Sequence, residues 1–305
     1  MPEQAQKRLA DSLTATRLSE RPAALGESPV WDAEGGCLWW IDGVAGEIRC
    51  HHPTRPEAEA VRIGGHIGSL ALAEAGQLLV ARDHAFLLVD PTAGAAQILL
   101  TLAGADPAMR LNDGATDRQG RFLCVGMGRS GAPLGAVHQL SADGRQRILA
   151  SGIRIGNGVC FSPDGATLYF TDTPARKTYA CDYDPASGEA SEPRVLADTA
   201  PLGSGVDGQT VDRDGNLWAA MIHSAEIGCF APDGRLLHRF KAPVDLPSSL
   251  AFGGADSGTL FVTSIRDSGT GRAVSKHPDG GHLFAIDGTG ATGIPETRFP
   301  ARISL

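Results

Sequence analysis

The sequence has no long apolar run, no cluster of basic residues and no closely spaced cysteine pair, and each absence excludes a class of protein. No stretch provides the ~18 uncharged apolar residues of a membrane-spanning helix. Residues 1–20 also lack the apolar core of a signal peptide. We therefore expect a cytoplasmic protein that has no membrane partner.

Basic residues are outnumbered by acidic ones. The chain carries 27 Lys and Arg against 35 Asp and Glu, which gives a formal net charge of −8. No run of Lys or Arg is long enough to bind a phosphate backbone. Nucleic acid is therefore not expected as a partner.

The cysteines are scattered, and none lies in a Cys-x-x-Cys pair. The six are Cys37, Cys50, Cys124, Cys160, Cys181 and Cys229. This spacing excludes a zinc knuckle or a redox dithiol and predicts reduced, buried thiols.

Long amphipathic helices are missing as well. Outside residues 1–15 no stretch is convincingly helical, and the links between apolar segments are only of turn length. A TIM barrel or a Rossmann fold needs helices of about 10–15 residues between its strands, so both are excluded. The 39 Gly and 19 Pro among 305 residues instead indicate many short elements joined by turns.

A unit of at least three β-rich segments recurs along the chain. Its second segment follows a turn glycine, and a third segment then ends in a turn of its own. The turn glycines, at intervals of 41 to 50 residues, are Gly35, Gly76, Gly120, Gly165 and Gly215. A fourth segment follows in most units, and a sixth, less regular copy begins near Ser248.

Six copies of a four-stranded antiparallel unit predict an all-β fold, the six-bladed β-propeller, because each blade can bury its apolar faces only against its neighbours. We predict a single domain over residues 16–305, after an N-terminal extension of residues 1–15. The strand that closes the ring comes from Thr14–Leu18 or from Thr297–Phe299, and the sequence leaves both open. A monomer is the expectation for a closed propeller.

The register of the repeat predicts which side chains meet, because equivalent positions of a propeller form rings around its central channel. The innermost strand of each blade begins at one mouth of that channel. Eight residues before the turn glycine, at that mouth, the chain has Glu27, Gly68, Asn112, Asn157 and Asp207, with Ser248 or Ser249 as the sixth member.

Two carboxylates and two amides that converge on one axis favour a bound cation. Without one they would repel each other or stay unsatisfied, and a hard divalent cation bound through oxygen neutralises both carboxylates. Taken singly, Asn157 before Gly158 and Asp207 before Gly208 are more typical of turns. The shared register is what favours a metal site.

The same residues lie in segments that resemble one family. The segments are Gly26-Glu27-Ser28-Pro29-Val30-Trp31, Arg110-Leu111-Asn112-Asp113-Gly114, Gly156-Asn157-Gly158-Val159 and Val206-Asp207-Gly208. In this order they resemble the regucalcin/gluconolactonase (senescence marker protein) family, of the bacterial sugar-lactonase type. The resemblance runs from about Arg21 to Phe284.

This resemblance implies a six-bladed propeller with one divalent metal, held by residues that map onto Glu27, Asn157 and Asp207. It also implies that Arg110 and Asn112 contact the sugar lactone. Three protein oxygens suit calcium, zinc, manganese, magnesium or ferrous iron, so the identity of the ion stays open.

The sequence departs from the family pattern at one place. Animal members have an acidic residue shortly after a methionine, where this chain has Arg129 and Ser130 after Met127. Because of this difference, the sequence leaves open which sugar lactone is preferred. The loops around the mouth also determine this preference, and the sequence does not predict where they lie.

The predicted activity is hydrolysis of a small-molecule sugar lactone, an aldonolactone, to the aldonic acid, a gluconolactonase-like reaction on a carboxylic ester bond. The metal would polarise the carbonyl, and Asp207 would act as general base. Arg110 and Asn112 would orient the sugar. Two alternatives stay open: a metal-dependent propeller hydrolase of the arylesterase or phosphotriesterase kind, and a noncatalytic calcium-binding propeller.

Other polar residues are expected at the rim of the same mouth. The second strands return there with Asp42, Asp83, Met127, Asp172 and His223. His223 could protonate a leaving group, but a lone loop histidine is more typical of a hydrogen-bonded structural residue. Asp42 and Asp172 are more typical of turn acceptors. None of these three enters the predicted catalytic set.

Two common enzyme motifs are absent or lie in the wrong context. The segment from Gly203 to Gly208 matches G-x-G-x-x-G, but a short strand and a turn follow it rather than a helix, so we discard a dinucleotide site. There is no Gly-x-Ser-x-Gly, so a serine esterase lacks its motif.

Overall fold

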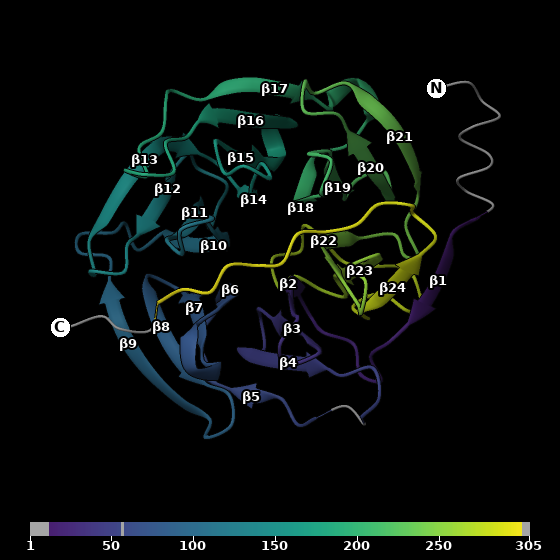
Figure 1. Cartoon of the computed structure of the whole chain (residues 1–305), viewed down its shortest axis with the longest axis horizontal. Helices are drawn as coiled ribbons and strands as arrows, with labels where there is room; N and C mark the ends of the chain where they lie inside the picture. The colour runs from purple at the N-terminus through teal and green to yellow at the C-terminus, as the bar shows by residue number, and fades with distance from the viewer. Residues whose placement is uncertain (1–11, 56–57, 301–305) are drawn as a thin grey trace.

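The computed structural model describes residues 12–55 and 58–300, which form six four-stranded sheets arranged in a ring (Figure 1). Consecutive strands within each sheet are antiparallel, as in the pairing of β2 (Gly26–Asp32) with β3 (Cys37–Asp42). The predicted all-β, six-bladed propeller is therefore confirmed. Most of the predicted N-terminal extension, residues 1–11, lies outside the described residues.

Each blade takes its strands in chain order from the channel outwards, apart from the sixth, whose outer strand comes from the N-terminal part of the chain. The remaining strands of blade 1 are β4 (Glu47–His51) and β5 (Val61–Arg62). Blade 2 consists of β6 (Ile67–Leu72), β7 (Leu78–Arg82), β8 (Ala85–Asp90) and β9 (Ala95–Thr101), and blade 3 of β10 (Met109–Thr116), β11 (Phe122–Gly128), β12 (Gly135–Leu140) and β13 (Gln146–Ile153). Blade 4 consists of β14 (Gly156–Phe161), β15 (Thr167–Asp172), β16 (Lys177–Asp182) and β17 (Arg194–Asp198), blade 5 of β18 (Val206–Val211), β19 (Leu217–Met221), β20 (Glu226–Phe230) and β21 (Leu236–Lys241), and blade 6 of β22 (Pro247–Gly253), β23 (Thr259–Ser264), β24 (Phe284–Asp287) and β1 (Thr14–Arg17).

Helical structure plays little part in the described ranges. The helical elements that lie wholly within these ranges are three 3-10 turns, η1 (Glu74–Gly76), η2 (Thr173–Ala175) and η3 (Ala200–Leu202). The segment Gly203–Gly208 runs into strand β18, so it does not open a helix. No helix of the described chain has the length and apolar character needed to cross a membrane.

The N-terminal strand closes the ring. β1 pairs antiparallel with β24, from Thr14 opposite Asp287 to Arg17 opposite Phe284. Of the two possibilities that the sequence left open, this is the first. The other candidate, around Phe299, makes one isolated parallel bridge to Ala73 instead.

The turn between the first two strands of a blade depends on a glycine and, in several blades, on an aspartate. Gly120 and Gly215 have φ angles of 85° and 86°, which favour glycine because it has no Cβ. The Oδ1 atoms of Asp117 and Asp212 accept backbone N–H groups across their turns. In blade 1 the residue with positive φ is Gly36, one position later than the predicted Gly35.

The core lies between the blades. Each of the six interfaces between neighbouring blades has its own cluster of buried apolar side chains. Phe86 of blade 2 meets Phe122 of blade 3 edge to face at 5.9 Å, and Trp31 of blade 1 stacks on Phe261 of blade 6 at 5.5 Å. The cysteines are unpaired, and all except the half-buried Cys50 are buried, so the prediction of buried thiols holds for five of the six.

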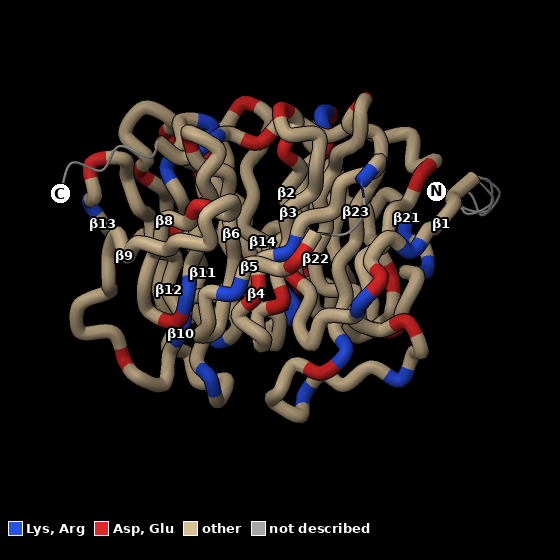
Figure 2. Tube along the Cα trace, turned by 90° about the horizontal axis from the view of Figure 1, so that it is seen from below, with Lys and Arg blue, Asp and Glu red and all other residues tan. Residues whose placement is uncertain are grey.

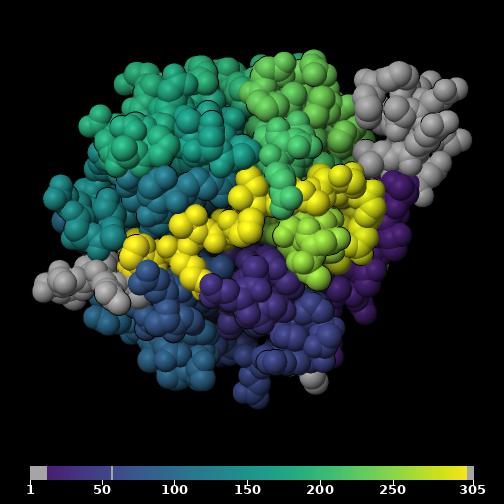
Figure 3. Space-filling model, in the orientation of Figure 1, coloured from purple at the N-terminus to yellow at the C-terminus, as the bar shows by residue number. Residues whose placement is uncertain are grey.

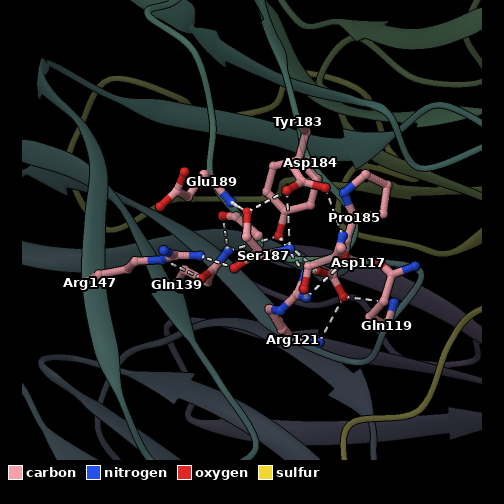
Figure 4. Close-up of polar contacts among 12 residues, drawn as sticks. Asp117, Gln119, Arg121, Gln139, Arg147, Tyr183, Asp184, Pro185, Ser187 and Glu189 are labelled. Carbon is pink, nitrogen blue, oxygen red and sulfur yellow. Dashed lines mark hydrogen bonds and ion pairs between the residues drawn. The ribbon is translucent and has the colours of Figure 1, made fainter.

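A polar network joins blade 4 to blade 3. The Tyr183 hydroxyl donates to Oδ2 of Asp117 at 2.7 Å and accepts from Nε2 of Gln139 at 2.8 Å. Arg121 adds an ion pair to the same Asp117 oxygen at 2.6 Å. Figure 4 shows these side chains pointing towards one another from three segments of the chain. Buried polar groups are thereby satisfied across a blade interface.

The C-terminal segment crosses one mouth of the channel. Residues 288–300 run over the middle of the face seen in Figures 1 and 3, from β24 towards blade 2. Gly293 bridges to Asp212, and Phe299 hydrogen-bonds to Leu72 and Glu74, all at the distal ends of inner strands or just beyond them. The other mouth, where the inner strands begin, is therefore the one that can admit a ligand. Figure 2 shows acidic and basic segments intermixed at both ends of the ring.

Candidate functional site

All six inner strands share one irregularity near their first residues. In each of them the pairing with the second strand shifts there, for example between Glu27 and Val30 and between Val206 and Gln209. The shift recurs in β6, β10, β14 and β22. A bulge bends a strand and re-aims a side chain. The predicted ring positions coincide with these bulges, or lie at their edge.

The bulges bring the predicted residues to one cavity. It has a volume of about 270 Å³ and opens at the mouth that the C-terminal segment leaves free. Its lining includes all the predicted site residues, which are Glu27, Arg110, Asn112, Asn157 and Asp207. Gly68 lines it too, and a Cβ there would lie 2.5 Å from the carbonyl oxygen of Asn112, so the neighbouring bulge needs glycine at this position.

The sixth ring position does not join this group. The Ser248 hydroxyl donates to the carbonyl oxygen of Gly26 and lies 3.0 Å from Oγ1 of Thr263. Ser249 lines a separate cavity of about 60 Å³ deeper in the channel. Ser248 therefore ties blade 6 to blade 1, and Ser249 lines the channel below the predicted site.

A line of hydrogen bonds orients the two amides. Nδ2 of Asn112 donates to Oδ1 of Asn157 at 2.7 Å and to the carbonyl oxygen of Gly156 at 2.8 Å. Nδ2 of Asn157 donates to Oγ1 of Thr173 at 2.8 Å, and that hydroxyl donates to the carbonyl oxygen of Val206 at 2.7 Å. Oδ1 of Asn157 keeps one lone pair that no described donor uses.

Arg110 is 8% exposed, and its guanidinium lies at the wall of the cavity. Nη1 donates to Oδ1 of Asn112 and to the carbonyl oxygen of Leu111. Its other nitrogens have no partner in the described ranges, so they are free to bind a ligand. Burial, and then the positive charge of Arg129, lower the pKa of Arg110 to about 10.

Neither carboxylate has an adequate partner. Asp207 is 6% exposed and has no hydrogen bond or ion pair to any residue that the structure describes. Glu27 has one long hydrogen bond, 3.4 Å, from the backbone N–H of Ser28. Burial and the charge of Asp113 raise the pKa of Asp207 to about 8, and burial and Asp207 raise the pKa of Glu27 well above its usual range.

Asp113 is a third carboxylate, to which the sequence analysis gave no role. It is buried below the ring, where Oδ1 accepts from the N–H of Gly114 and Oδ2 from the N–H of Val159 in the next blade. Burial raises its pKa to about 6. Its place in the Arg-Leu-Asn-Asp-Gly segment was the only available signal, because its partner in the next blade is 46 residues away.

The donor set fits a hard divalent cation. Two under-partnered buried carboxylates and an amide oxygen with a free lone pair are the groups that such an ion binds. Among the described residues, no group of three or more His, Cys, Asp and Glu is placed to hold a metal. The predicted set has only two such residues, Glu27 and Asp207, because its third member is Asn157.

The rim residues behave largely as the sequence predicted. Asp42 accepts from the N–H of Ala45, three residues on, and is therefore a turn acceptor as predicted. Asp172 instead accepts from the N–H groups of Arg154 and Ile155, in the segment that enters its blade, so its prediction as a turn acceptor is wrong. His223 is a hydrogen-bonded loop residue whose Nδ1 accepts from the N–H of Gly205 at 2.9 Å. It also lines the cavity, in keeping with its predicted place at the rim of this mouth.

An apolar collar surrounds the polar centre, and of its residues only Met127 was predicted at this mouth. All six blades contribute one residue each, which are Leu25, Ile67, Met127, Ile155, Ile222 and Ile265. Three of these stand one or two residues before a ring position, so the register that found the ring could also have found them. The collar limits access of water to the polar groups beneath it.

Arg129 and Ser130 lie where this sequence departs from the family pattern. Arg129 pairs with Asp83 of blade 2 at 3.0 Å, and Ser130 is exposed. Neither lines the cavity.

Comparison with known proteins gives one consistent result. Residues 25–266 match the model of the SMP-30/gluconolactonase/LRE-like region. A putative sugar lactone lactonase of Rhizobium meliloti is 34% identical over 88% of this chain and 92% of its own. Regucalcin of Xenopus laevis is 31% identical over 90% of this chain and 94% of its own. The solved structure of a calcium-binding protein, regucalcin, from Agrobacterium tumefaciens has a TM-score of 0.86 at 27% identity and covers 94% of this chain and 97% of its own.

Proposed function

The chain belongs to the SMP-30/gluconolactonase/LRE-like family, and from this membership and the chemistry of the cavity we propose that it hydrolyses the ester bond of a sugar lactone. The substrate is an aldonolactone, and the product is the aldonic acid. The reaction takes place in the cavity lined by Glu27, Arg110, Asn112, Asn157 and Asp207.

One observation supports the proposal most strongly. The buried Asp207 carboxylate faces the same cavity as the unpaired donors of Arg110, and no described residue neutralises it. A folded chain retains such a group at a cost in stability, so perturbed carboxylates in a cavity are typical of functional sites.

We assign Glu27, Asn157 and Asp207 as ligands of a divalent cation. When bound there, such an ion supplies a Lewis acid for the lactone carbonyl and favours ionisation of water. Asn112 holds Oδ1 of Asn157 in place through its 2.7 Å hydrogen bond. The collar of apolar residues keeps bulk water away, which strengthens the electrostatic interactions inside.

Arg110 and Asn112 position the sugar. The free guanidinium nitrogens of Arg110 donate to sugar hydroxyls, which accept well from a charged donor. Because Nη1 of Arg110 is fixed by Asn112 and Leu111, the remaining nitrogens have a defined direction. Such fixed donors reduce the entropy cost of bringing the carbonyl to the reacting groups.

Asp207 handles the proton. Hydrolysis adds the oxygen of water to the carbonyl carbon, breaks the bond from that carbon to the ring oxygen and delivers a proton to the ring oxygen. Asp207 accepts the proton of the attacking water as general base, a role that typically contributes 10²–10⁴-fold in rate.

The test is a pair of variants assayed with an aldonolactone. Asp207→Asn keeps the size of the side chain but removes the base, so kcat falls by about 10²–10⁴-fold. Arg110→Ala raises KM by about tenfold and lowers kcat less, because it removes hydrogen bonds to the bound sugar. Asp143→Asn, at an exposed turn of the far mouth, is the control and keeps the wild-type rate. Near-wild-type turnover by Asp207→Asn would sink the assignment of this residue.

A further inference from the structure

A loop of blade 6 reaches across the open mouth. Residues 265–283 connect β23 to β24, and Arg272 in this loop lines the cavity. Its guanidinium lies against Gly131 of blade 3, which is the opposite blade of the ring. A Cβ on Gly131 would lie 3.7 Å from both Nη1 and Nη2 of Arg272. The loop thus places a positive charge over the entrance.

The position of Arg272 is fixed by its neighbours. The N–H of Arg272 donates to Oγ1 of Thr270, and the N–H of Ser268 donates to the carbonyl oxygen of Ala273. Ala273 packs against the apolar cluster of Leu25, Ile222 and Ile265 below the loop. These contacts hold the base of the arginine while its long side chain spans the mouth.

A second guanidinium approaches the same glycine. Nε of Arg154, from the start of blade 4, donates to the carbonyl oxygen of Gly131 at 3.0 Å. Neither Arg154 nor Arg272 has a carboxylate partner in the parts of the chain that the structure describes, whereas nearby Arg129 is paired with Asp83. Two like charges gathered without a counterion oppose each other, so their placement favours an anion between them.

The charge balance of the cavity points the same way. Its charged lining consists of Glu27, Asp207, Arg110 and Arg272. A divalent cation offsets the two carboxylates of the lining, and the buried Asp113 below them supplies at most one further negative charge, so the two guanidinium groups leave the site with an excess of positive charge. A mouth with this excess attracts anionic ligands.

We propose that the preferred lactone carries a negatively charged substituent at the end away from its ester, and that Arg272, with Arg154 beside it, binds that substituent. This inference rests on the proposed lactone hydrolysis and specifies its substrate class. Carboxylate, sulfonate and phosphate share the required chemistry. Arg110 holds the hydroxyl groups near the buried carboxylates, while Arg272 holds the charged end at the entrance.

Matched pairs of lactones test the inference. D-Glucaro-1,4-lactone differs from D-glucono-1,4-lactone by a carboxylate in place of a hydroxymethyl group, and 6-phospho-D-glucono-1,5-lactone differs from D-glucono-1,5-lactone by a phosphate. The charged member of at least one pair should have a kcat/KM about tenfold higher, as expected for one charged hydrogen-bonded contact. The two pairs distinguish a carboxylate substrate from a phosphate substrate.

Variants test whether Arg272 causes the preference for charged lactones. Arg272→Gln should lower kcat/KM by about tenfold for the charged lactone and by less for its neutral partner, so the ratio moves towards one. Arg154→Gln should have a smaller effect of the same sign. Arg145→Gln changes an exposed arginine of the far mouth and leaves the ratio as in the wild type. Added salt should weaken the preference, because Arg272 is exposed.

The outcomes separate the two proposals. Hydrolysis of the neutral lactones with no gain for either charged partner overturns the anion site and leaves the proposed function standing. A gain that Arg272→Gln leaves intact overturns the role of this residue. If no lactone of either pair is hydrolysed by metal-loaded protein, the proposed function fails, and the inference fails with it.

Discussion

Nδ2 of Asn112 donates a hydrogen bond of 2.7 Å to Oδ1 of Asn157. The two residues lie in the inner strands of blades 3 and 4, and the bond joins the proposed sugar-binding pair to the proposed metal ligands. Oδ1 is the atom through which an asparagine binds a hard cation. The orientation of that ligand therefore depends on a residue assigned to the substrate.

This relationship predicts that Asn112→Ala weakens metal binding. Loss of a partner that orients a ligand typically costs 10–100-fold in metal affinity. Titration calorimetry on metal-stripped protein measures the effect, and Gln119→Ala at an exposed turn of the far mouth is the control. Equal metal affinities of Asn112→Ala and wild type would show that Asn157 needs no such support.

Removal of the metal should make stability depend on pH. Asp207 has a folded-state pKa of about 8, raised by burial and by Asp113 from its ordinary value of 3.8. Such a group favours folding while it is protonated, so its contribution is complete below about pH 3.8 and is lost as the pH rises through about 8. The metal-free protein should therefore lose thermal stability between these limits, and Asp207→Asn should lose less. A steeper loss in Asp207→Asn than in the wild type would contradict the assignment.

Metal binding should release protons for the same reason. Near pH 7 an Asp207 with a pKa of about 8 is largely protonated, and the carboxylate must ionise to bind a cation. Calorimetric titration in two buffers of different ionisation enthalpy should report about one proton released per ion. Identical heats in both buffers would mean that the carboxylates are already ionised before the metal binds.

The contacts of Tyr183 predict a change in stability that spares the site. Tyr183→Phe removes the donor to Asp117 and the acceptor for Gln139 in the network of Figure 4, so the free energy of unfolding should fall by about 1–3 kcal/mol. Tyr179→Phe, which removes a hydroxyl without a partner among the described residues, should have a smaller effect. Chemical denaturation measures both variants, and equal losses would rule out the network as the cause.

The fold was predictable because its signals repeat. A turn glycine at a near-constant interval marks five of the six blades, and the position eight residues before it lies at the bulge of the inner strand. The count therefore reached Glu27, Asn157 and Asp207 without knowledge of the bulges. In blade 1 the count from Gly35 still gives Glu27, although the residue with positive φ in that turn is Gly36.

The rest of the site depends on contacts between blades, which the sequence does not encode locally. Ser248 lies at the predicted position of its strand, but its hydroxyl donates to the carbonyl oxygen of Gly26 in the neighbouring blade and does not line the cavity. Asp113 is held by a backbone N–H of Val159, in the next blade. The loop that contains Arg272 interrupts the repeat, so no register predicts that it meets Gly131 across the ring.

The most direct test of the account is a hydrolysis assay on metal-stripped protein. The lactones are five- and six-membered aldonolactones, with one aryl ester for comparison, and calcium, zinc, manganese, magnesium and ferrous iron are restored one at a time. We predict no turnover without metal and rapid opening of at least one lactone when one ion is restored. Full activity of the metal-free protein, hydrolysis of the aryl ester alone, or silence on every substrate with metal bound would contradict it.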